Sequence, residues 1–553
     1  MKEAYGKAKN AYLRFESMAP GIPECAVLCL FVLSLAIMMY YHEPWYDEAQ
    51  AWLIARDGTW KEILFEIPHY EGHPPFWFVF LALFAKAGAD FTLTIRALTL
   101  CINACAVAVL LFRSPFPRVV RFLLPFTYFA FYQHGVICRP YSFLFLGLLL
   151  TASLWEKKNE KPFLAVLSLM LCCASSAYGI LLAGGIAICW LTEEAKGKNV
   201  SGFLKGIFSG KRFFAFLLLL VFALANIALI FPHDDTFAAS YGMTGHSVLF
   251  RLCYMFFGSV ADATLFSCYE DYNELRYASF GIGKYIAGCV IGALLLVLIL
   301  YIGYKNGTLM LFALPFSFFA LFSGIVYFYL QHIDVLFQFL LFWAWVTYKK
   351  SLAKPKEAPK KKWQKAVRPV CAGVSALAVA VSLCWTFLAC RNEVWFPYGY
   401  AEAITEYLDS KGLSDLGIMV RWKSDTNPDG STYMNVNQTV NGVALNAYYD
   451  HNIVVNMNGG EEKETFASHR IPSDEETEKI LAAWQKMGLP ALSLDKCQIG
   501  VLFPEYGDAY RTFYDCILKA PEYHLWKGDL TYTEHKLYIR KDIVRKYRLE
   551  PEF

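Results

Sequence analysis

Two adjacent carboxylates, Asp47 and Glu48, follow directly after the first apolar run of the chain, and His73 comes about 25 residues later in the sequence GHPPFW. A carboxylate at a membrane surface can act as a general base, and a nearby cationic side chain can bind an anionic group. The structural alternative is that the two acids only begin a helix, where they favour its dipole, and that the His-Pro-Pro run is a rigid turn. These residues alone leave both interpretations open.

The stretch from Trp45 to Asp57 has the pattern of a helix that lies at a membrane interface, with its aromatic and apolar residues among the lipid headgroups. Glu48 and Arg56 share one stripe of this helix, so the spacing predicts an interaction between them through the intervening turn. Asp47 is about 100° further round the helix and faces different surroundings. Two carboxylates in different environments can divide the roles of base and partner, and we predict Asp47 as the base.

The composition is that of a membrane protein. Of 553 residues, 56% are hydrophobic and only 18% are charged, and the mean hydropathy is +0.34. The charged residues gather in a few places and leave long uncharged runs between them. Soluble proteins of this size are less apolar, so the sequence predicts a polytopic α-helical membrane protein.

The apolar runs are long enough to cross a bilayer as helices, which takes about 20 residues each. The basic N-terminus leads into the first run with no small-residue cleavage site, which predicts a retained first span. The uncharged run from Pro162 to Thr192 is too long for one helix, and turn residues at 175–179 divide it. Eleven spans are predicted, near residues 25–41, 97–112, 120–136, 140–155, 162–177, 179–193, 213–232, 285–304, 308–329, 333–348 and 368–390.

The short apolar run from Phe76 to Ala85 decides the topology, because it fits either a short span or an interfacial helix. If it stays at the interface, the basic clusters all fall on one side of the membrane, as the positive-inside rule requires. These clusters cover residues 1–14, 113–121, 157–161, 196–212 and 349–368. The sequence therefore predicts an interfacial helix, a cytoplasmic N-terminus and two outer loops, at 42–96 and 233–284.

The composition changes at about residue 391, which divides the chain into a transmembrane domain (1–390) and a small C-terminal α/β domain (391–553). Because the number of spans is odd, the second domain is predicted to be extracytoplasmic. Its predicted helices cover 401–411 and 474–487, and its predicted strands cover 416–420, 453–457, 498–503 and 530–539.

The second outer loop, residues 233–284, is rich in aromatic side chains and fits either a flexible lid or an ordinary amphipathic connector. Asp234 and Asp235 in this loop are a weak candidate pair for a divalent cation. No Cys/His pattern with metal-ligand spacing occurs, so no metal ligands are assigned and the need for a cofactor stays unknown.

Most of the 16 cysteines lie inside apolar runs, where they serve as small hydrophobic residues for helix packing. On the predicted outer side, Cys253 has Cys268 as a potential disulfide partner, and Cys497 has Cys516. Free thiols are the equal alternative, because nothing in the sequence fixes the redox compartment.

A longer pattern joins the features of the N-terminal part. A basic N-terminus, one span, the motif DE-A in a helix that ends IARD, and then GHPPFW resemble the GT-C glycosyltransferases, and glycosyltransferase family 39 in particular. That family includes protein O-mannosyltransferases, the aminoarabinose transferase that acts on lipid A, and bacterial lipid-linked sugar transferases. The resemblance is specific over about residues 20–145, general in topology to about 390, and absent from the C-terminal domain.

The resemblance implies roles for matched residues in the first outer loop. Asp47 matches the family's catalytic acidic residue, and Glu48 matches its acidic neighbour. His73 stands where relatives have His or Lys beside the lipid phosphate. Arg96 matches an Arg that opens the next span.

Two further positions resemble the family's phosphate-binding residues. Arg139, in the run CRPY, resembles an Arg at the outer start of a later span, although the residues after it differ from the commonest versions. His332 resembles the second residue of an Arg-His pair, but Gln331 replaces the Arg and puts a phosphate role there in doubt. Arg139 and His332 both lie at span ends, where snorkelling to the interface is the structural alternative.

By this resemblance, the chain would transfer a sugar from a polyprenyl-phosphate donor to a cell-envelope glycan, lipid or protein acceptor at the outer face of the cell membrane. The configuration at the anomeric carbon would be inverted, and no nucleic-acid partner is expected. A carboxylate base beside the acceptor and cationic groups beside the departing phosphate suit that chemistry. The main rival is a transporter or flippase of lipid-linked sugars, which predicts ionisable residues near mid-membrane and broken, repeated spans. A non-catalytic envelope receptor is a second rival, and it leaves the charges of the first loop unexplained.

Overall fold

The computed structural model describes residues 14–16, 18–195, 210–236, 246–270, 280–354, 364–420, 423–426, 432–435, 440–456, 470–495, 499–527 and 529–552. Lys360 to Lys362, in the basic cluster at 349–368, lie outside these residues, and so does Cys497. The central parts of the second outer loop, 237–245 and 271–279, lie outside them as well.

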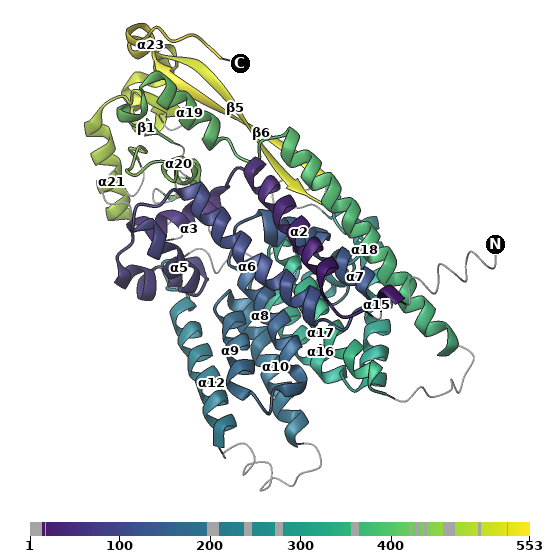
Figure 1. Cartoon of the computed structure of the whole chain (residues 1–553). Coiled ribbons are helices and arrows are strands. Elements are labelled where there is room, and N and C mark those ends of the chain that lie inside the picture. Colours follow the sequence, from purple (N-terminus) through teal and green to yellow (C-terminus); the bar gives the residue numbers. More distant parts are fainter. Residues whose placement is uncertain are drawn as a thin grey trace, which may run out of the picture.

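The chain is mostly helical, and its C-terminal residues gather over one end of a bundle of long helices (Figure 1). This confirms the coarse prediction of a helical membrane protein with a small C-terminal sheet. Within the described ranges, six helical stretches are long and apolar enough to cross a membrane. They are α2 (Ile22–Tyr41), α6 (Phe91–Arg113), α12 (Gly210–Ile230), α15 (Ile282–Asn306), η7 with α17 (Leu330–His332 and Ile333–Leu352), and α18 (Gln364–Trp395).

The other five predicted spans correspond to shorter helical pieces, so the count of eleven spans stays a prediction. Four of them are single helices: α8 (Tyr141–Leu154), α9 (Pro162–Cys173), α10 (Ala177–Ala195) and α16 (Leu309–Ile325). The segment predicted at 120–136 is broken into α7 (Arg118–Leu123), the 3-10 turn η2 (Leu124–Phe126) and the π-helix η3 (Phe129–Val136). Pro125 lies at the break, where its ring and missing amide hydrogen interrupt helical bonding.

The long helices differ in how much of their surface the protein covers. In the most apolar 18-residue stretch of each helix, the buried share is 11% for α18 and 17% for both α12 and α15. The corresponding share for α17 is 78%. Exposed leucine and valine side chains on three helices suit contact with lipid tails, which are equally apolar. We infer that α17 is an inner helix of the bundle and that α12, α15 and α18 are peripheral.

The segment predicted as the first outer loop, residues 42–96, contains four short helical elements: α3 (Tyr46–Asp57), η1 (Glu62–Glu66), α4 (Pro68–Glu71) and α5 (Phe76–Ala85). The ten residues of α5 cover about 15 Å at 1.5 Å per residue, which is about half the thickness of the bilayer core. Helix α5 packs against α3 instead of standing in the bundle as a separate long helix. Its length and packing agree with the interfacial helix predicted from the charge distribution.

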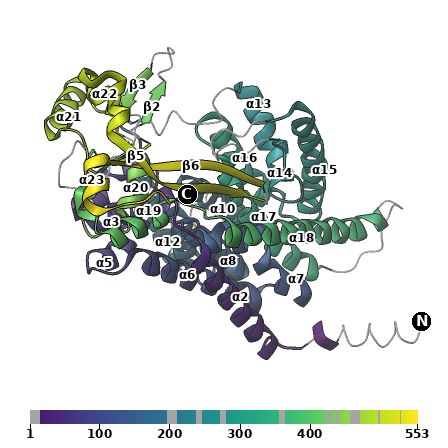
Figure 2. The same ribbon diagram turned by 90° about the horizontal axis from the view of Figure 1, so that it is seen from above.

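The C-terminal residues form a four-stranded sheet of order β1-β4-β6-β5, in which only β1 and β4 are parallel. Its long β5–β6 hairpin extends across the helical bundle beside α18 (Figure 2). The strands are β1 (Ile418–Met419), β4 (Leu492–Leu494), β5 (Tyr514–Trp526) and β6 (Asp529–Arg540), with a separate hairpin of β2 (Lys423–Thr426) and β3 (Thr432–Asn435). The helices are α19 (Ala401–Lys411), α20 (Val440–Asn446), α21 (Asp474–Met487), α22 (Ile499–Leu502) and α23 (Lys541–Tyr547).

The prediction of a strand at 498–503 is wrong, because residues Ile499–Leu502 form the helix α22. The run is short and continuously apolar, a pattern that periodicity cannot assign to helix or strand. The strand predicted at 453–457 is reduced to a single bridge between Val454 and Ile418. Helices α19 and α21 have the bounds that the sequence predicts.

Candidate functional site

Asp47 lies in the first turn of α3, and its carboxylate forms an ion pair with Arg139. The Asp47 Oδ2 to Arg139 Nη1 distance is 2.5 Å, and both side chains keep partial solvent access, 29% and 16% respectively. A charge-assisted contact of this length is strong, and its partial exposure leaves the acid open to an incoming group. The fold thus brings together the acid and the cation that the sequence singled out separately.

Glu48, the neighbouring acid, is fully buried and faces the other way. Its Oε1 accepts a 2.6 Å hydrogen bond from the amide of Cys138, and its Oε2 accepts one from the amide of Trp45 at 3.1 Å. Because Cys138 directly precedes Arg139, the first bond holds the chain at the point where Arg139 meets Asp47. Glu48 therefore positions the site, and its burial keeps it from direct contact with a substrate in this state.

His42 joins Glu48 to a second buried carboxylate, Glu393 of α18. The His42 ring bonds Glu48 through Nε2 at 3.0 Å and Glu393 through Nδ1 at 2.8 Å, and Tyr132 donates to the other oxygen of Glu393. Burial opposes a charged imidazole, but the two carboxylates outweigh it and raise the pKa of His42 to about 10. Burial likewise acts to raise the pKa of Glu48, yet the His42 charge and three hydrogen bonds hold that pKa below its usual value.

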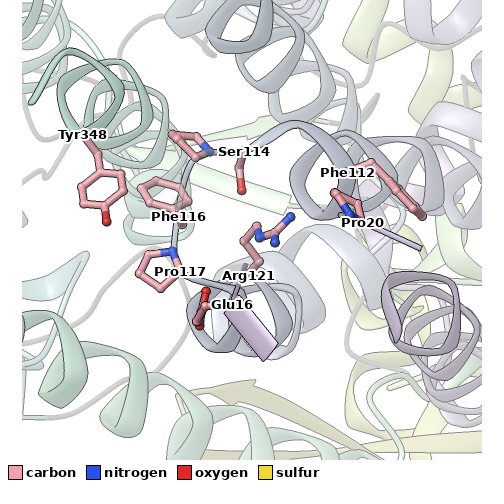
Figure 3. A pocket seen from close by; sticks show the side chains of 9 residues that line it. Glu16, Pro20, Phe112, Ser114, Phe116, Pro117, Arg121 and Tyr348 are labelled. Atoms are coloured by element: carbon pink, nitrogen blue, oxygen red, sulfur yellow. The ribbon is translucent and has the colours of Figure 1, made fainter. Parts of the chain in front are cut away.

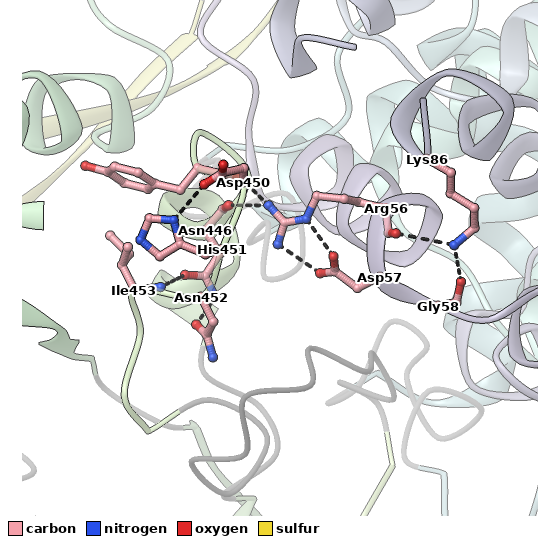
Figure 4. Close-up of polar contacts among 10 residues, drawn as sticks. Arg56, Asp57, Gly58, Lys86, Asn446, Asp450, His451, Asn452 and Ile453 are labelled. Atoms are coloured by element: carbon pink, nitrogen blue, oxygen red, sulfur yellow. Dashed lines mark hydrogen bonds and ion pairs between the residues drawn. The ribbon is translucent and has the colours of Figure 1, made fainter. Parts of the chain in front are cut away.

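The predicted interaction between Glu48 and Arg56 is wrong. Arg56 binds the carboxylate of Asp57 at 2.6 Å and 2.9 Å, and it donates to the carbonyls of Asn446, at 3.1 Å, and Tyr449. Figure 4 shows its guanidinium between Asp57 and the loop after α20. Since Glu48 is satisfied inside the fold and Arg56 is satisfied by the C-terminal domain, the shared helix stripe brings the two charges no closer.

His73, Tyr141 and His332 follow one another at the same end of the bundle. The Tyr141 ring lies 5.9 Å from that of His73 and 5.5 Å from that of His332, between ring centroids. His332 is buried, and its Nδ1 lies 3.3 Å from the hydroxyl of Tyr178. His73 and Arg139 both lie within electrostatic range of His332, so three of the predicted phosphate-binding residues form one cluster.

Arg96, the fourth predicted phosphate-binding residue, has a different contact. Its Nη2 donates to the backbone carbonyl of His42 at 2.7 Å, on the side of the buried His42 network. Electrostatically it acts on Glu402 of α19, where it opposes the burial that raises the pKa of that acid. The hydrogen bond joins α6 to the residue that follows α2, and no observed contact joins Arg96 to Asp47 or His73 among the described residues.

The second outer loop offers no free acidic pair in the part that is described. Asp235 is bound by Arg470 at 3.0 Å and by the hydroxyl of Tyr70 at 3.1 Å, so its charge is already balanced. Within the described ranges, no group of three or more His, Cys, Asp or Glu side chains is arranged for a metal ion. Cys253 and Cys268 are both free thiols in this structure.

Sequence reasoning missed a buried pair of ionisable side chains inside the bundle. His134 of η3 and Asp334 of α17 approach to 3.3 Å, and Gln338 lies 2.5 Å from the same ring. His134 comes from one apolar run and Asp334 and Gln338 from another, about 200 residues later, so the sequence gave no signal that they meet. The contact between His42 and Glu393 was missed because 351 positions separate the two residues in the sequence.

Comparison of the chain with family models, with curated proteins and with solved structures finds no match. The resemblance to the GT-C glycosyltransferases therefore depends on the residues of the motifs themselves.

Proposed function

We propose that this protein is a membrane glycosyltransferase that uses a polyprenyl-phosphate sugar as donor. The observation that carries the proposal is the ion pair between Asp47 and Arg139, with His73 and His332 clustered beside it. This arrangement supplies one partly exposed carboxylate and several groups that can bind an anion. Transfer of a sugar from a lipid phosphate needs both kinds of group within one site.

In the proposed reaction, an acceptor hydroxyl attacks the anomeric carbon of the donor from the face opposite the phosphate. Asp47 takes the hydroxyl proton as the new C–O bond forms. The bond between the anomeric carbon and the phosphate oxygen breaks, and polyprenyl phosphate leaves with the electron pair. Arg139 and His73 are the groups proposed to bind that departing charge, with the buried His332 behind them, and the product has inverted stereochemistry.

The surrounding contacts support this division of roles. Glu48 is held by two backbone amides and by the buried His42, so it stays ionised and positions the chain before Arg139. Asp47 has one ionic partner, and a phosphate that attracts Arg139 would release the carboxylate to act as a base. The C-terminal domain contacts the same loop through Arg56, which supports a role in acceptor binding at the outer face.

The decisive test is Asp47→Asn, assayed with a polyprenyl-phosphate sugar and a crude cell-envelope acceptor in proteoliposomes. We expect transfer to fall by at least about a thousandfold, as for loss of an essential base, while thermal stability stays within a few degrees. Asp90→Asn is the matched control, because Asp90 is an exposed helix cap of the same loop and Asn caps equally well. Transfer at the normal rate by Asp47→Asn contradicts the proposal.

One observation favours a second candidate, a transporter or flippase of lipid-linked sugars. The pair of His134 and Asp334 is buried in the bundle, and intramembrane ionisable residues often mark a transport path. His134→Ala separates the two functions. A transporter would lose movement of a fluorescent lipid-linked sugar across the bilayer, whereas the proposed transferase would keep sugar transfer if it remains folded.

A further inference from the structure

A cavity of about 400 Å³ lies at the opposite end of α2 and α6 from Asp47, under the connection between α6 and α7. Its walls include Glu16, Ser114, Arg121, Phe112, Phe116 and Tyr348 (Figure 3). Helix α2 has 20 residues, so about 30 Å of helix separates this cavity from the proposed transfer site. The cavity thus belongs to the other face of the membrane domain.

Two buried polar atoms of this cavity have no hydrogen-bond partner in the described structure: the Ser114 hydroxyl and the Arg121 Nε. The two side chains are only 8% and 7% exposed. The rest of the Arg121 guanidinium donates to the Leu111 carbonyl at 2.5 Å and lies 3.6 Å from Glu24. Leaving a buried donor unpaired is unfavourable, so this pair of groups favours a ligand that brings an acceptor. Figure 3 shows the Ser114 hydroxyl and the Arg121 guanidinium directed into the same space.

Glu16 gives the cavity a charge of the opposite sign. Its carboxylate accepts hydrogen bonds from the amides of Arg118, at 2.7 Å, and Val119, at 3.4 Å, which hold it in place at the cavity. A simple anion would be attracted by Arg121 and repelled by Glu16. A ligand with both a phosphate and an ammonium group would find a partner for each.

Beside the cavity, α6 and α7 present an apolar edge of exposed side chains. Phe112, which lines the cavity, is 36% exposed, and Val119 and Leu123, which lie outside its wall on α7, are 42% and 39% exposed. In a membrane these exposed side chains face lipid tails, which places the cavity at the level of the headgroups. A ligand with acyl chains would lay them along this apolar edge.

We propose that this cavity binds the headgroup of an ethanolamine-type phospholipid, with the phosphate against Arg121 and Ser114 and the ammonium group against Glu16. The site lies apart from the transfer chemistry, so it stands independently of the proposed function. A choline headgroup carries the same charges but has no N–H to donate to Glu16, and a glycerol headgroup has no cation. Selectivity among these three headgroups is therefore the property that the side chains predict.

The test measures lipid binding to the purified full-length protein by native mass spectrometry, with phosphatidylethanolamine, phosphatidylcholine and phosphatidylglycerol of identical acyl chains. We expect the ethanolamine lipid to bind about tenfold more tightly than either other lipid, the factor that one charge-assisted hydrogen bond supplies. Soluble phosphoethanolamine and inorganic phosphate are included as headgroup probes. Strong binding of either probe would show that a free phosphate compound, not a lipid, is the ligand, and would overturn the proposal.

Three variants locate the site. Ser114→Ala is expected to weaken binding of the ethanolamine lipid about tenfold, and Arg121→Gln to weaken it further. Glu16→Gln keeps an acceptor for the Arg118 amide but removes the charge, so it is expected to abolish the preference over phosphatidylglycerol. Arg113→Gln is the control, because Arg113 is an exposed cation at the end of α6 that lies outside the cavity wall.

The alternative results are equally informative. Equal binding of all three lipids, or a preference for the anionic one by the unaltered protein, overturns the proposal. Unchanged binding in Ser114→Ala and Glu16→Gln places the lipid elsewhere and overturns it too, even if Arg121→Gln fails to fold.

Discussion

Arg139 is the residue on which the proposed chemistry depends most after Asp47. Its guanidinium has several donors in a planar fork that matches phosphate, whereas a lysine supplies one point charge. We expect Arg139→Lys to raise KM for the polyprenyl-phosphate donor about tenfold, equivalent to about 1.4 kcal/mol, with a smaller fall in kcat. Steady-state kinetics in proteoliposomes measure both constants. An unchanged KM with a reduced kcat would place Arg139 outside donor binding.

His42 is a stabilising residue of the same site, because it neutralises two buried carboxylates. Removing one partner of such a network leaves uncompensated buried charge and costs about 3–5 kcal/mol. We expect His42→Ala to lower the thermal unfolding temperature strongly. The exposed His451 is the control, and His451→Ala is expected to have no measurable effect.

The His42 network also predicts a pH dependence. The pKa of His42 rises from 6.5 to about 10 on folding. The stability that protonated His42 contributes is therefore complete below about pH 6.5 and is lost as the pH rises toward 10. Thermal unfolding of the unaltered protein between pH 6.5 and 10 should show this loss. The same decline in His42→Ala would assign it to other groups.

At the scale of elements, Glu43 couples the end of α2 to the start of α19. Its Oε1 accepts a 2.7 Å hydrogen bond from the Glu402 amide, and Gly399 lies so close that a Cβ there would be 2.7 Å from the same oxygen. Burial raises the pKa of Glu43 from 4.5 to about 7. As the pH rises, Glu43 in the unfolded chain loses its proton near pH 4.5, whereas in the folded state it keeps the proton up to about pH 7. The contribution of Glu43 to stability therefore falls as the pH rises from about 4.5 to 7.

Glu43→Gln tests this coupling, because glutamine keeps an acceptor for the Glu402 amide and carries no charge. We expect the variant to be more stable than the unaltered protein at pH 8, by on the order of 2 kcal/mol, and about equal at pH 4.5. Differential scanning fluorimetry at the two pH values measures the difference. Glu406→Gln, an exposed change on the same helix, is the control. A lower stability of Glu43→Gln at pH 8 would contradict the assignment.

At the scale of the whole molecule, the tip of the β5–β6 hairpin inserts into the membrane domain. Lys527 has a φ of 46°, and its Nζ donates to Asp262 of α14 (Ser259–Asp262), at 3.0 Å to Oδ1 and 2.7 Å to the carbonyl. Both side chains are at most 1% exposed, and the Lys527 Nζ lies 4.3 Å from the centroid of the Trp385 ring. This buried pair joins the C-terminal sheet to the segment between α12 and α15.

A double-mutant cycle tests that junction. Lys527→Met and Asp262→Asn are each expected to destabilise the protein by about 3–5 kcal/mol, because each leaves one partner buried and unpaired. The double variant should lose far less stability than the two single variants lose together, and thermal unfolding measures the difference. Additive losses would show that the two side chains act independently. Lys536→Met, on the exposed side of β6, is the control.

The sequence predicts well those features that follow from local pattern. Helices α19 and α21 have the predicted bounds because an amphipathic period, an N-cap serine in one case and a following glycine define them locally. The bounds of α5 match the short apolar run at 76–85, and its interfacial position stays a prediction from its length and the distribution of basic clusters. Helix α22 was mistaken for a strand because four apolar residues carry no period.

Side-chain partners were predicted less well, and the reason differs from residue to residue. Asp47 and Arg139 were both chosen from the sequence, and the fold pairs them. Arg56 was assigned to Glu48, but its acceptors include the backbone carbonyls of residues 446 and 449. Every residue has a backbone carbonyl, so residue type cannot identify these acceptors.

The sequence by itself determined the membrane character of the chain, because hydropathy and charge distribution are sums over neighbouring residues. It also determined which residue types are available for chemistry at the end of the first span. Only the tertiary structure decided that Asp47 meets Arg139, that Glu48 is enclosed with His42 and that the C-terminal sheet reaches Asp262. A buried charge is stable only beside a partner, and the fold can bring that partner from any distance along the chain.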